Sequence, residues 1–421
     1  MKIKKLTLSG MRAFSQAEFD FQPGFNLLVG VNGVGKTTVL DALRISLSRV
    51  LPQITKYSSQ KHSFNFGDIT IGLNSLQVSC DFYFNSKSFN FLYVKQRESV
   101  IGNKPGSPRE SVYEVGDVEK ITPPLSEIIP TKIDLTPLAL FFSTKRSIIS
   151  DKTVSGHATA GGLAAAFSES LSANRENNLR LLKDWFKVQI ALGEERPLGL
   201  KHINVLKDAV ESFLPGFKDL RIEETDDKSS IVIDKNGTTL DLIRQLSDGE
   251  RGVLAMVLDL ARRLSQANPH VENPLKEGTA IVLIDELDLH LHPKWQRRIV
   301  DNLTRTFPNC QFIATTHSPQ IIGEVKPNMI TIIDKTIYSP PNSYGLDSSR
   351  LLEEVLDTIP RNRNVDSMLK DLSLLINKTE LKKAKSLLKE LSEILGHNDP
   401  EIIRSNTMIS FLENDLLDEK D

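Results

Sequence analysis

A glycine-rich segment near residue 30 has the residue types and spacing of a phosphate-binding loop. Residues 30–37 read GVNGVGKT and fit the pattern G-x-x-x-x-G-K-[ST]. In such a loop the glycines let several backbone N–H groups point at one phosphate, the lysine reaches the β- and γ-phosphates, and the threonine hydroxyl binds Mg²⁺. A chance match to the four specified positions has odds on the order of one in a hundred. The sequence therefore predicts a site for ATP and Mg²⁺ that includes Gly30, Asn32, Gly33, Gly35, Lys36, Thr37 and Thr38.

Two carboxylates follow an apolar strand later in the chain. Residues 281–286 read IVLIDE. A buried strand would hold Asp285 rigidly as a ligand of Mg²⁺, and the next carboxylate, Glu286, would orient or deprotonate a water that attacks the γ-phosphate. The alternative interpretation is an acidic turn after a core strand. The phosphate-binding loop makes the catalytic interpretation the stronger one.

Two further motifs contain polar residues that could contact nucleotide. Residues 246–250 read LSDGE, in which Ser247 is a good N-cap and Glu250 completes a capping box. That structural role holds whatever else the motif does. His317 lies in the segment TTHSP after a predicted strand. A lone histidine there is more often a capping or core residue, but beside the other motifs it is a candidate sensor of the γ-phosphate.

The predicted elements around these motifs alternate between apolar strands and helices. Residues 25–29 are predicted to form a strand before the loop, and residues 38–50 a helix that ends near Pro52. Strands are predicted over 280–284 and 311–315, with a helix over 293–307 between them. This alternation indicates a parallel α/β architecture.

The remaining segments are predicted to add an antiparallel sheet and two groups of helices. Strands are predicted over 2–8, 17–21, 69–84 and 88–96, the last two as part of the antiparallel sheet. A further buried strand is predicted over 138–142, and Asn236-Gly237 marks a hairpin. Helices are predicted over 169–192 and 201–213. Beyond a joint at 342–345, the pattern predicts a charged helical tail with helices over 349–356, 364–375, 379–395 and 400–416.

Composition excludes several functional classes. The 421 residues include 52 Lys plus Arg against 54 Asp plus Glu, which argues against a protein that coats DNA by charge alone. Basic residues such as Lys145 and Arg146 are scattered and form no long stripe. The chain has two cysteines and no CxxC, so two buried core thiols are expected rather than a zinc site. The chain has no apolar run of about 18 residues, which predicts a cytoplasmic protein without a membrane span.

Taken in order, the four motifs resemble the ATPase heads of the ABC type found in the SMC and RecF class. Residues 30–38 resemble the Walker A motif, 281–286 the Walker B motif, 287–293 the D-loop, and His317 the switch histidine. Residues 246–250 resemble the ABC signature, with Asp248 where glycine is usual. The resemblance implies a composite site, in which Ser247, Gly249 and Glu250 of one copy contact the ATP of another. It also implies a Q-loop glutamine, for which Gln96 is preferred and Gln60 is the rival.

The expected fold is thus an α/β ABC-type ATPase head with a parallel core sheet, an antiparallel β subdomain, a helical insertion and a helical tail. The predicted divisions are an N-terminal lobe over 1–150, a helical insertion over 151–230, a C-terminal lobe over 231–340 and a helical region for oligomerisation or partner docking over 341–421.

The absence of a long coiled coil argues against an SMC protein, and the helical tail argues against a Toprim nuclease domain. The segment DLHLHP at 288–293 and the tail resemble bacterial AAA-family ATPases of antiphage systems, most closely the PtuA family, the ATPase subunits of Septu and some retron systems. The resemblance implies a homo-oligomer that acts with an HNH nuclease subunit (PtuB-like) and, in a retron, with a reverse transcriptase and its msDNA. The alternative is a stand-alone RecF/SMC-like ATPase of DNA repair that binds nucleic acid.

The chain offers no nuclease metal cluster of its own by sequence. Of the eight histidines, only His290 and His292 are close in sequence. Packing at the start of a helix or a subunit contact is the preferred interpretation of this pair, ahead of metal ligation.

Overall fold

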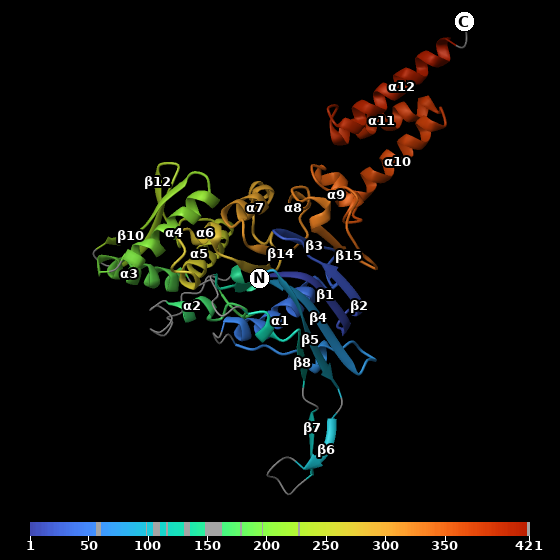
Figure 1. The fold of residues 1–421 in the computed structure, drawn as a ribbon. Coiled ribbons are helices and arrows are strands. Elements are labelled where there is room, and N and C mark those ends of the chain that lie inside the picture. The colour runs from blue at the N-terminus through green and yellow to red at the C-terminus, as the bar shows by residue number, and fades with distance from the viewer. Residues whose placement is uncertain are drawn as a thin grey trace. The chain divides into compact units, whose positions relative to one another are not determined.

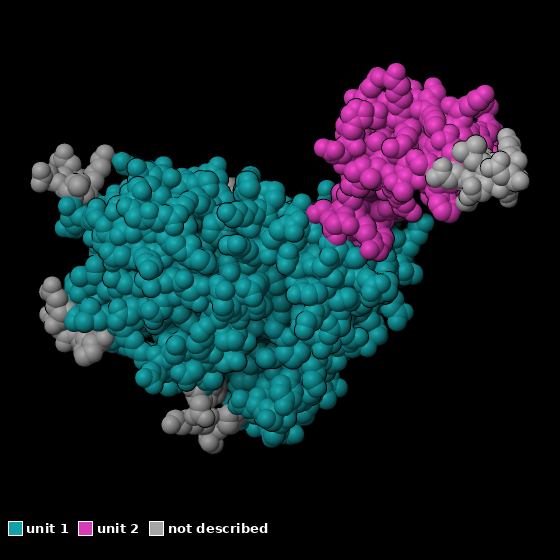
Figure 2. Space-filling model, turned by 90° about the horizontal axis from the view of Figure 1, so that it is seen from above, with its two compact units in different colours: residues 1–346 teal, residues 347–421 magenta. Residues whose placement is uncertain are grey.

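The computed structural model of the protein describes residues 1–55, 60–97, 99–103, 110–114, 117–129, 135–147, 162–176, 179–195, 197–225 and 228–418. The chain divides into two compact units, residues 1–346 and residues 347–421, which Figure 2 colours separately. The division falls directly after the joint predicted at 342–345. Each unit is described by itself.

A six-stranded sheet lies at the centre of the first unit (Figure 1), in the order β16-β15-β3-β14-β13-β9. Five strands run parallel and β16 is antiparallel to β15. Every residue of β3, β9, β13 and β14 is buried, as expected for a sheet covered on both faces. The predicted parallel α/β core is confirmed. The strands are β3 (Phe25–Val29), β9 (Leu138–Phe142), β13 (Ala280–Ile284), β14 (Gln311–Thr316), β15 (Ile330–Ile333) and β16 (Ile337–Tyr338).

Helix α1 (Lys36–Thr55) follows the glycine-rich loop and continues past Pro52, where the sequence predicted its end. Pro52 lies in the last turn, so only one helical hydrogen bond is lost there. The Thr55 hydroxyl donates to the carbonyl of Leu51 at 2.9 Å within this last turn. Leu51 and Ile54 are both buried, so their packing favours the extra turn.

An antiparallel five-stranded sheet, in the order β2-β1-β4-β5-β8, packs its apolar face with α1 into one core. Strand β4 begins at Ser75 rather than at the predicted residue 69, because residues 66–74 turn back onto β1: the Arg12 N–H donates to the Asp68 carbonyl at 2.7 Å. The paired strands 75–84 and 87–96 confirm the predicted antiparallel sheet. The strands are β1 (Lys2–Met11), β2 (Phe14–Asp20), β4 (Ser75–Phe84), β5 (Lys87–Gln96) and β8 (Val118–Thr122), with a separate pair β6 (Ser99–Asn103) and β7 (Glu110–Glu114).

The middle of the chain contains helices and a three-stranded sheet. The helix predicted over 169–192 begins only at Leu179, because residues 169–175 run beside β9 and bond to it: the Phe141 N–H donates to the Ser170 carbonyl at 2.8 Å. The hairpin predicted at Asn236-Gly237 is confirmed. Residues 148–161, which include the start of the predicted helical insertion, lie outside the described residues. The elements are α2 (Leu163–Phe167), α3 (Leu179–Glu195), α4 (Pro197–Phe213), β10 (Phe217–Thr225), β11 (Lys228–Lys235) and β12 (Thr238–Asp241).

Further helices carry or flank the later motifs of the first unit, and the helix predicted over 293–307 is confirmed. The two cysteines are buried and free, as predicted. The helices are α5 (Asp248–Ala267), α6 (Pro274–Glu277), α7 (Pro293–Thr306) and α8 (Pro319–Ile322). Short 3₁₀ turns cover Phe66–Asp68, Leu125–Glu127, Thr144–Ser147 and Pro327–Met329.

The second unit is a small helical bundle that matches the predicted tail. Its helices have their own apolar core, which includes Leu372, Ala384, Leu391 and Ile409. An ion pair between Lys385 and Glu413, 2.7 Å apart, joins two of the helices at the surface. The helices are α9 (Ser348–Glu354), α10 (Arg363–Asn377), α11 (Leu381–Leu395) and α12 (Pro400–Asp418). Within the described residues, no helix in either unit is long and apolar enough to cross a membrane.

Candidate nucleotide site

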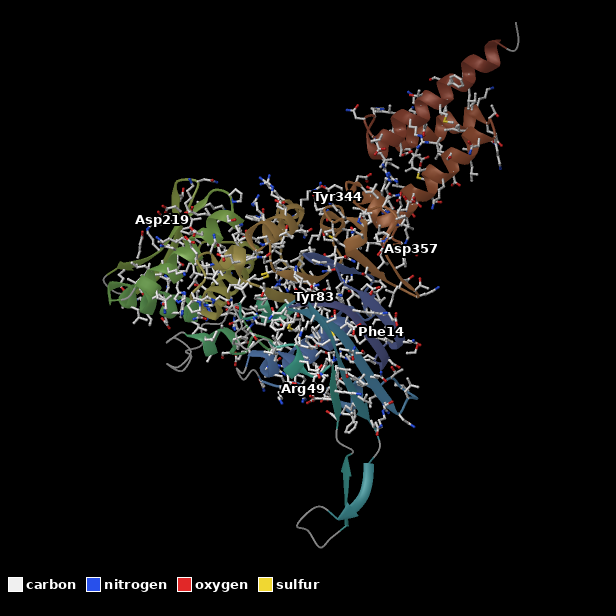
Figure 3. The ribbon with its side chains drawn as sticks, viewed as in Figure 1. Phe14, Arg49, Tyr83, Asp219, Tyr344 and Asp357 are labelled. Carbon is white, nitrogen blue, oxygen red and sulfur yellow. The ribbon has the colours of Figure 1, made fainter. Side chains whose placement is uncertain are left out.

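The glycines of the phosphate-binding loop stand where a side chain would not fit. A Cβ atom on Gly30 would lie 2.3 Å from the carbonyl oxygen of Ile333, and one on Gly35 would lie 2.6 Å from the ring of Phe14, which is labelled in Figure 3. Gly35 also has φ +110°, a conformation that favours glycine. The loop between β3 and α1 is therefore shaped by neighbours on two other strands. Asn32 and Gly33 are exposed on it.

Lys36 is buried and folds back onto the loop. Its Nζ donates to the carbonyl oxygens of Gly30 at 2.8 Å and Val31 at 3.0 Å. Burial lowers the pKa of Lys36, while the nearby carboxylates of Asp285, Glu286 and Asp288 oppose that shift. The ammonium group thus lies inside the curve of the loop, where phosphate oxygens could replace the two carbonyls as acceptors.

Three elements bring oxygen ligands together at the carboxyl end of β13. The Thr37 hydroxyl on α1 lies 3.3 Å from the Asp285 carboxylate, and the Thr315 hydroxyl on β14 donates to the same carboxylate at 2.7 Å. Hydroxyl and carboxylate oxygens are the ligands that Mg²⁺ prefers, and Mg²⁺ in nucleotide sites keeps its other positions for water and phosphate. Thr37 and Asp285, the two predicted metal ligands, are therefore adjacent and fit that ion. Thr38 is buried behind them.

Glu286 begins the turn after β13 with its main chain fixed and its side chain free. Its N–H donates to the Thr315 hydroxyl at 2.7 Å, and its φ of +49° is uncommon for a residue with a side chain. Among the described residues, none is hydrogen-bonded to its carboxylate. That carboxylate is half-buried one residue beyond the predicted metal ligand Asp285 and is available for a water.

His317 follows β14 and faces the same carboxylates. Its N–H donates to Asp288 at 3.4 Å. Burial and the charge of Lys36 lower the pKa of His317, although Asp288, Glu286 and Asp285 oppose the shift. The imidazole is therefore neutral at pH 7 and close enough to Lys36 to respond to its charge.

The LSDGE segment forms the predicted capping box at the start of α5. Ser247 is the N-cap, and its hydroxyl is hydrogen-bonded to the Glu250 carboxylate at 2.9 Å. Glu250 also accepts from Lys235 at 2.5 Å, and this contact together with Ser247 lowers its pKa against the effect of burial. In the described part of the chain, no hydrogen bond joins Ser247 to the phosphate-binding loop.

The start of α5 packs against the segment that follows Glu286. A Cβ atom on Gly249 would lie 2.3 Å from the carbonyl oxygen of His290. A narrow cavity lies beside this contact, lined by Gly249, Met256, Leu289 and Ile299 among others. His292 is the N-cap of α7, and its Nδ1 accepts from the Lys294 N–H at 3.2 Å, as the helix-start interpretation predicted. In the described ranges, no group of three or more His, Cys, Asp or Glu is arranged to hold a metal ion.

The two glutamine candidates lie elsewhere. Gln96 ends β5 opposite Ser75 in the antiparallel sheet, and Gln60 is exposed in a loop. Neither is joined to Asp285 by a hydrogen bond between described residues, so the role of Gln96 remains a prediction from resemblance.

Arg146 is a residue of the site that the sequence did not single out. It is buried, and its guanidinium donates to the main-chain carbonyls of Asp285 and Glu286. Burial lowers its pKa to about 10, against the raising effect of the three carboxylates nearby, so it is charged at pH 7. The one feature of the sequence that could have indicated its role is its place four residues after the predicted strand 138–142.

Two family models match the chain. One, described as an AAA ATPase domain, matches residues 1–99, and the other, described as "AAA domain, putative AbiEii toxin, Type IV TA system", matches residues 172–323. The two segments contain all four motifs of the predicted site.

Relatives extend along most of the chain. The Retron Ec83 probable ATPase of Escherichia coli is 28% identical over 86% of this chain and 77% of its own length. The Retron Vc95 probable ATPase of Vibrio cholerae is 28% identical, with 84% and 78% covered. A Septu protein PtuA of Bacillus thuringiensis is 23% identical, with 85% and 83% covered.

Solved structures with a similar arrangement include the SMC head domain from Thermotoga maritima, with a TM-score of 0.45 and 16% identity over 80% of this chain and 96% of that one. The recombination mediator RecF bound to an ATP analogue gives a TM-score of 0.43 and 13% identity, with 80% and 98% covered. With the phosphate-binding loop and the paired carboxylates in place, these findings indicate an ATPase that is similar to AAA ATPase domains over residues 1–99 and 172–323 and, over most of its length, to the retron ATPases and to Septu PtuA.

Proposed function

We propose that this ATPase binds ATP with Mg²⁺ at residues 30–38 and Asp285, and hydrolyses it with a water activated by Glu286. The observation that carries the proposal is the convergence of Thr37, Asp285 and Glu286 at one sheet edge, beside the buried Lys36. Asp285 would hold the metal, Lys36 would bind the phosphates, and the free carboxylate of Glu286 would take a proton from the water. His317, neutral and near Lys36, would contact the γ-phosphate.

The site is proposed to be composite. Ser247 hydrogen-bonds within its own capping box, and the start of α5 packs on its own D-loop segment through Gly249. An exposed helix N-terminus with this orientation suits a phosphate of a second copy, because its backbone N–H groups and dipole favour an anion. ATP would then join two heads, with Ser247, Gly249 and Glu250 of each facing the nucleotide of the other.

The relatives suggest the biological setting. Their names place these relatives in retron and Septu systems, and from this we propose that ATP turnover in this chain regulates a partner HNH nuclease in antiphage defence. The partner would be PtuB-like, with a reverse transcriptase and msDNA added if the setting is a retron, and the complex would act in the cytoplasm. The helical region at 341–421 is the proposed region for oligomerisation or docking, in addition to the lobes proposed at 1–150 and 231–340 and the insertion at 151–230.

The test is native mass spectrometry of the chain expressed with its neighbouring genes, with and without ATP and Mg²⁺. A Glu286→Gln variant is included because it should bind ATP, hydrolyse it slowly and accumulate the associated state. A stable complex that contains a small nuclease subunit supports the proposal. An ATP-dependent homodimer without a companion favours the stand-alone DNA-repair ATPase, and an unaltered turnover in Glu286→Gln would remove that residue from its role.

A further inference from the structure

Arg146 reaches the end of the Walker B strand from the strand beside it. Strands β9 and β13 are parallel, with Phe142 opposite Ile284, so the segments that follow the two strands leave the sheet at the same edge. The Asp285 N–H donates to the Phe142 carbonyl at 2.9 Å, which extends the pairing by one residue. The 3₁₀ turn at Thr144–Ser147 then directs Arg146 inward, and its N–H donates to the Ser143 carbonyl at 3.0 Å.

The guanidinium of Arg146 binds two consecutive main-chain carbonyls with two different nitrogens. Nη1 donates to the carbonyl of Asp285 and Nη2 to the carbonyl of Glu286, while Nη1 also donates to Ser143 at 3.2 Å. A planar guanidinium has donors in a fixed fork, so a two-point contact sets the direction of both carbonyls. Arg146 is only 7% exposed.

This contact matters because Glu286 has an unusual backbone conformation. Its φ is +49°, in the left-handed region that residues with a Cβ seldom adopt. On one side its N–H is held by the Thr315 hydroxyl at 2.7 Å, and on the other its carbonyl is held by Arg146. The peptide groups on both sides of Glu286 are thus fixed, and the direction of its side chain follows from them.

We propose that Arg146 is a positioning residue for ATP hydrolysis, which aims the Glu286 carboxylate at the attacking water by clamping the two carbonyls around it. The proposal rests on the proposed function of Glu286. Arg146 touches neither nucleotide nor water in this scheme, and it acts only through the main chain of residues 285 and 286. Its contribution to the reaction is to keep the strained turn at Glu286 in one conformation.

The geometry distinguishes this role from a general need for a buried cation. A lysine at position 146 would keep the charge near Asp285 and Glu286, but a single ammonium cannot hold two carbonyls in the plane of a fork. The Arg146→Lys variant should therefore bind ATP normally and hydrolyse it slowly. A misplacement of about 1 Å in a reacting group can cost roughly 100-fold in rate, so a loss of at least about tenfold in kcat is expected.

The experiment measures steady-state kcat and KM for ATP, and the ATP Kd by calorimetry, for wild type, Arg146→Lys and Arg146→Met in the full chain. The matched control is Lys145→Met, since Lys145 is exposed and contacts Asn174 at 2.6 Å rather than the site. We expect kcat to fall at least about tenfold in both Arg146 variants, with KM and Kd within about threefold of wild type, and no change in the control. If Arg146→Met fails to fold, Arg146→Lys still carries the test because it keeps the buried charge.

A double variant separates positioning from independent effects. Because Arg146 acts through Glu286, Arg146→Lys should not slow an enzyme that already carries Glu286→Gln. The proposal is overturned if Arg146→Lys keeps wild-type kcat, if its ATP affinity falls as much as its kcat, or if it slows Glu286→Gln by the same factor as wild type. Normal turnover of Glu286→Gln alone would instead refute the proposed function, so the two failures are distinct.

Discussion

Replacement of Asp259 by asparagine should destabilise the first unit strongly, because this carboxylate is the shared counter-charge of three buried arginines. Asp259 on α5 accepts from Arg262 at 2.7 Å, from Arg263 at 3.0 Å and from Arg175 at 2.8 Å. The three arginine side chains are only 5% to 10% exposed. The pKa of Asp259 is accordingly held far below its usual range, since the attraction of the three guanidiniums outweighs the cost of burial.

The size of the effect follows from what remains after the substitution. Removal of one partner from a buried ion pair typically costs about 3–5 kcal/mol. The Asp259 side chain is 21% exposed, and each arginine keeps another acceptor, such as the Ala166 carbonyl for Arg263 at 2.7 Å. Both facts favour the lower end, so Asp259→Asn should lower the free energy of unfolding by about 3 kcal/mol. In a unit of this size, that corresponds to a fall in Tm of roughly 5 °C.

The assay is urea and thermal unfolding, followed by the fluorescence of the buried Trp185 on α3. Asp301→Asn is the control, because Asp301 and Arg305 have the same i,i+4 spacing as Asp259 and Arg263 but their side chains are 74% and 49% exposed. It should cost less than about 0.5 kcal/mol. A loss below about 1 kcal/mol for Asp259→Asn, or equal losses in the two variants, would refute the reasoning.

The pH dependence provides a second check on the same residue. The folded pKa of Asp259 is depressed, so its contribution is fully present above the pKa of an unfolded aspartate, about 3.9, and is lost as the pH falls through the folded value. The difference in stability between wild type and Asp259→Asn should therefore be constant from pH 7 to about 5 and shrink at more acidic pH. A difference that is already shrinking at pH 6 would contradict the assignment.

Three further predictions concern the nucleotide site. Lys36→Ala should weaken ATP binding by at least about 100-fold, since it removes charge-assisted bonds to two phosphates, and calorimetry showing unchanged affinity would contradict the loop assignment. Ser247→Arg should prevent ATP-dependent association of two heads while leaving ATP binding intact, and sedimentation that still shows the ATP-induced dimer would argue against a composite site. Burial and the charge of Lys36 lower the pKa of His317, so its imidazole takes up a proton at a lower pH than a free histidine does. A comparison of kcat–pH profiles for wild type and His317→Gln should therefore place any histidine-dependent loss of turnover below the pH at which a free imidazole titrates, and a loss at or above that pH would contradict the assignment.

The elements that position the site could be predicted because buried parallel strands have an unmistakable sequence pattern. Residues 280–284 are all apolar, residues 25–29 contain one polar residue, and residues 311–316 have an apolar centre at 312–314. All of them are buried in adjacent strands of one sheet. Once these strands are adjacent and parallel, the residues at their carboxyl ends must meet. The contact between Thr37 and Asp285 thus follows from two motifs 248 residues apart.

Boundaries were predicted less well where tertiary contacts outweigh local preference. Helical spacing continues from residue 169 onward, but the chain forms turns up to residue 174, because the carbonyls of Ser170 and Ala173 accept from the Phe141 N–H on β9 and from the Ser143 hydroxyl just after it. At Pro52 the reverse happens, and the packing of Leu51 and Ile54 carries a helix past a residue that usually ends one. Hydrophobic periodicity predicts neither outcome, because it describes one segment at a time and contains no information about contacts between segments.

The buried arginines were the least predictable charged residues of the first unit, and the reason is physical. A sequence pattern treats Arg146, Arg175 and Arg263 as surface residues, because a lone guanidinium is costly to bury. Arg146 and Arg175 have partners on other elements, the carbonyls after β13 for Arg146 and Asp259 on α5 for Arg175. Arg263 pairs with Asp259 on its own helix. Arg263 also donates to the carbonyls of Ala166 and Ser168. Before residues 148–161, the buried Arg146 therefore bonds the chain to the turn after β13. After them, the buried Arg263 on α5 bonds the chain at Ala166 and Ser168. Substitutions of Arg146 or Arg263 should therefore lower stability or turnover more than substitutions of exposed arginines.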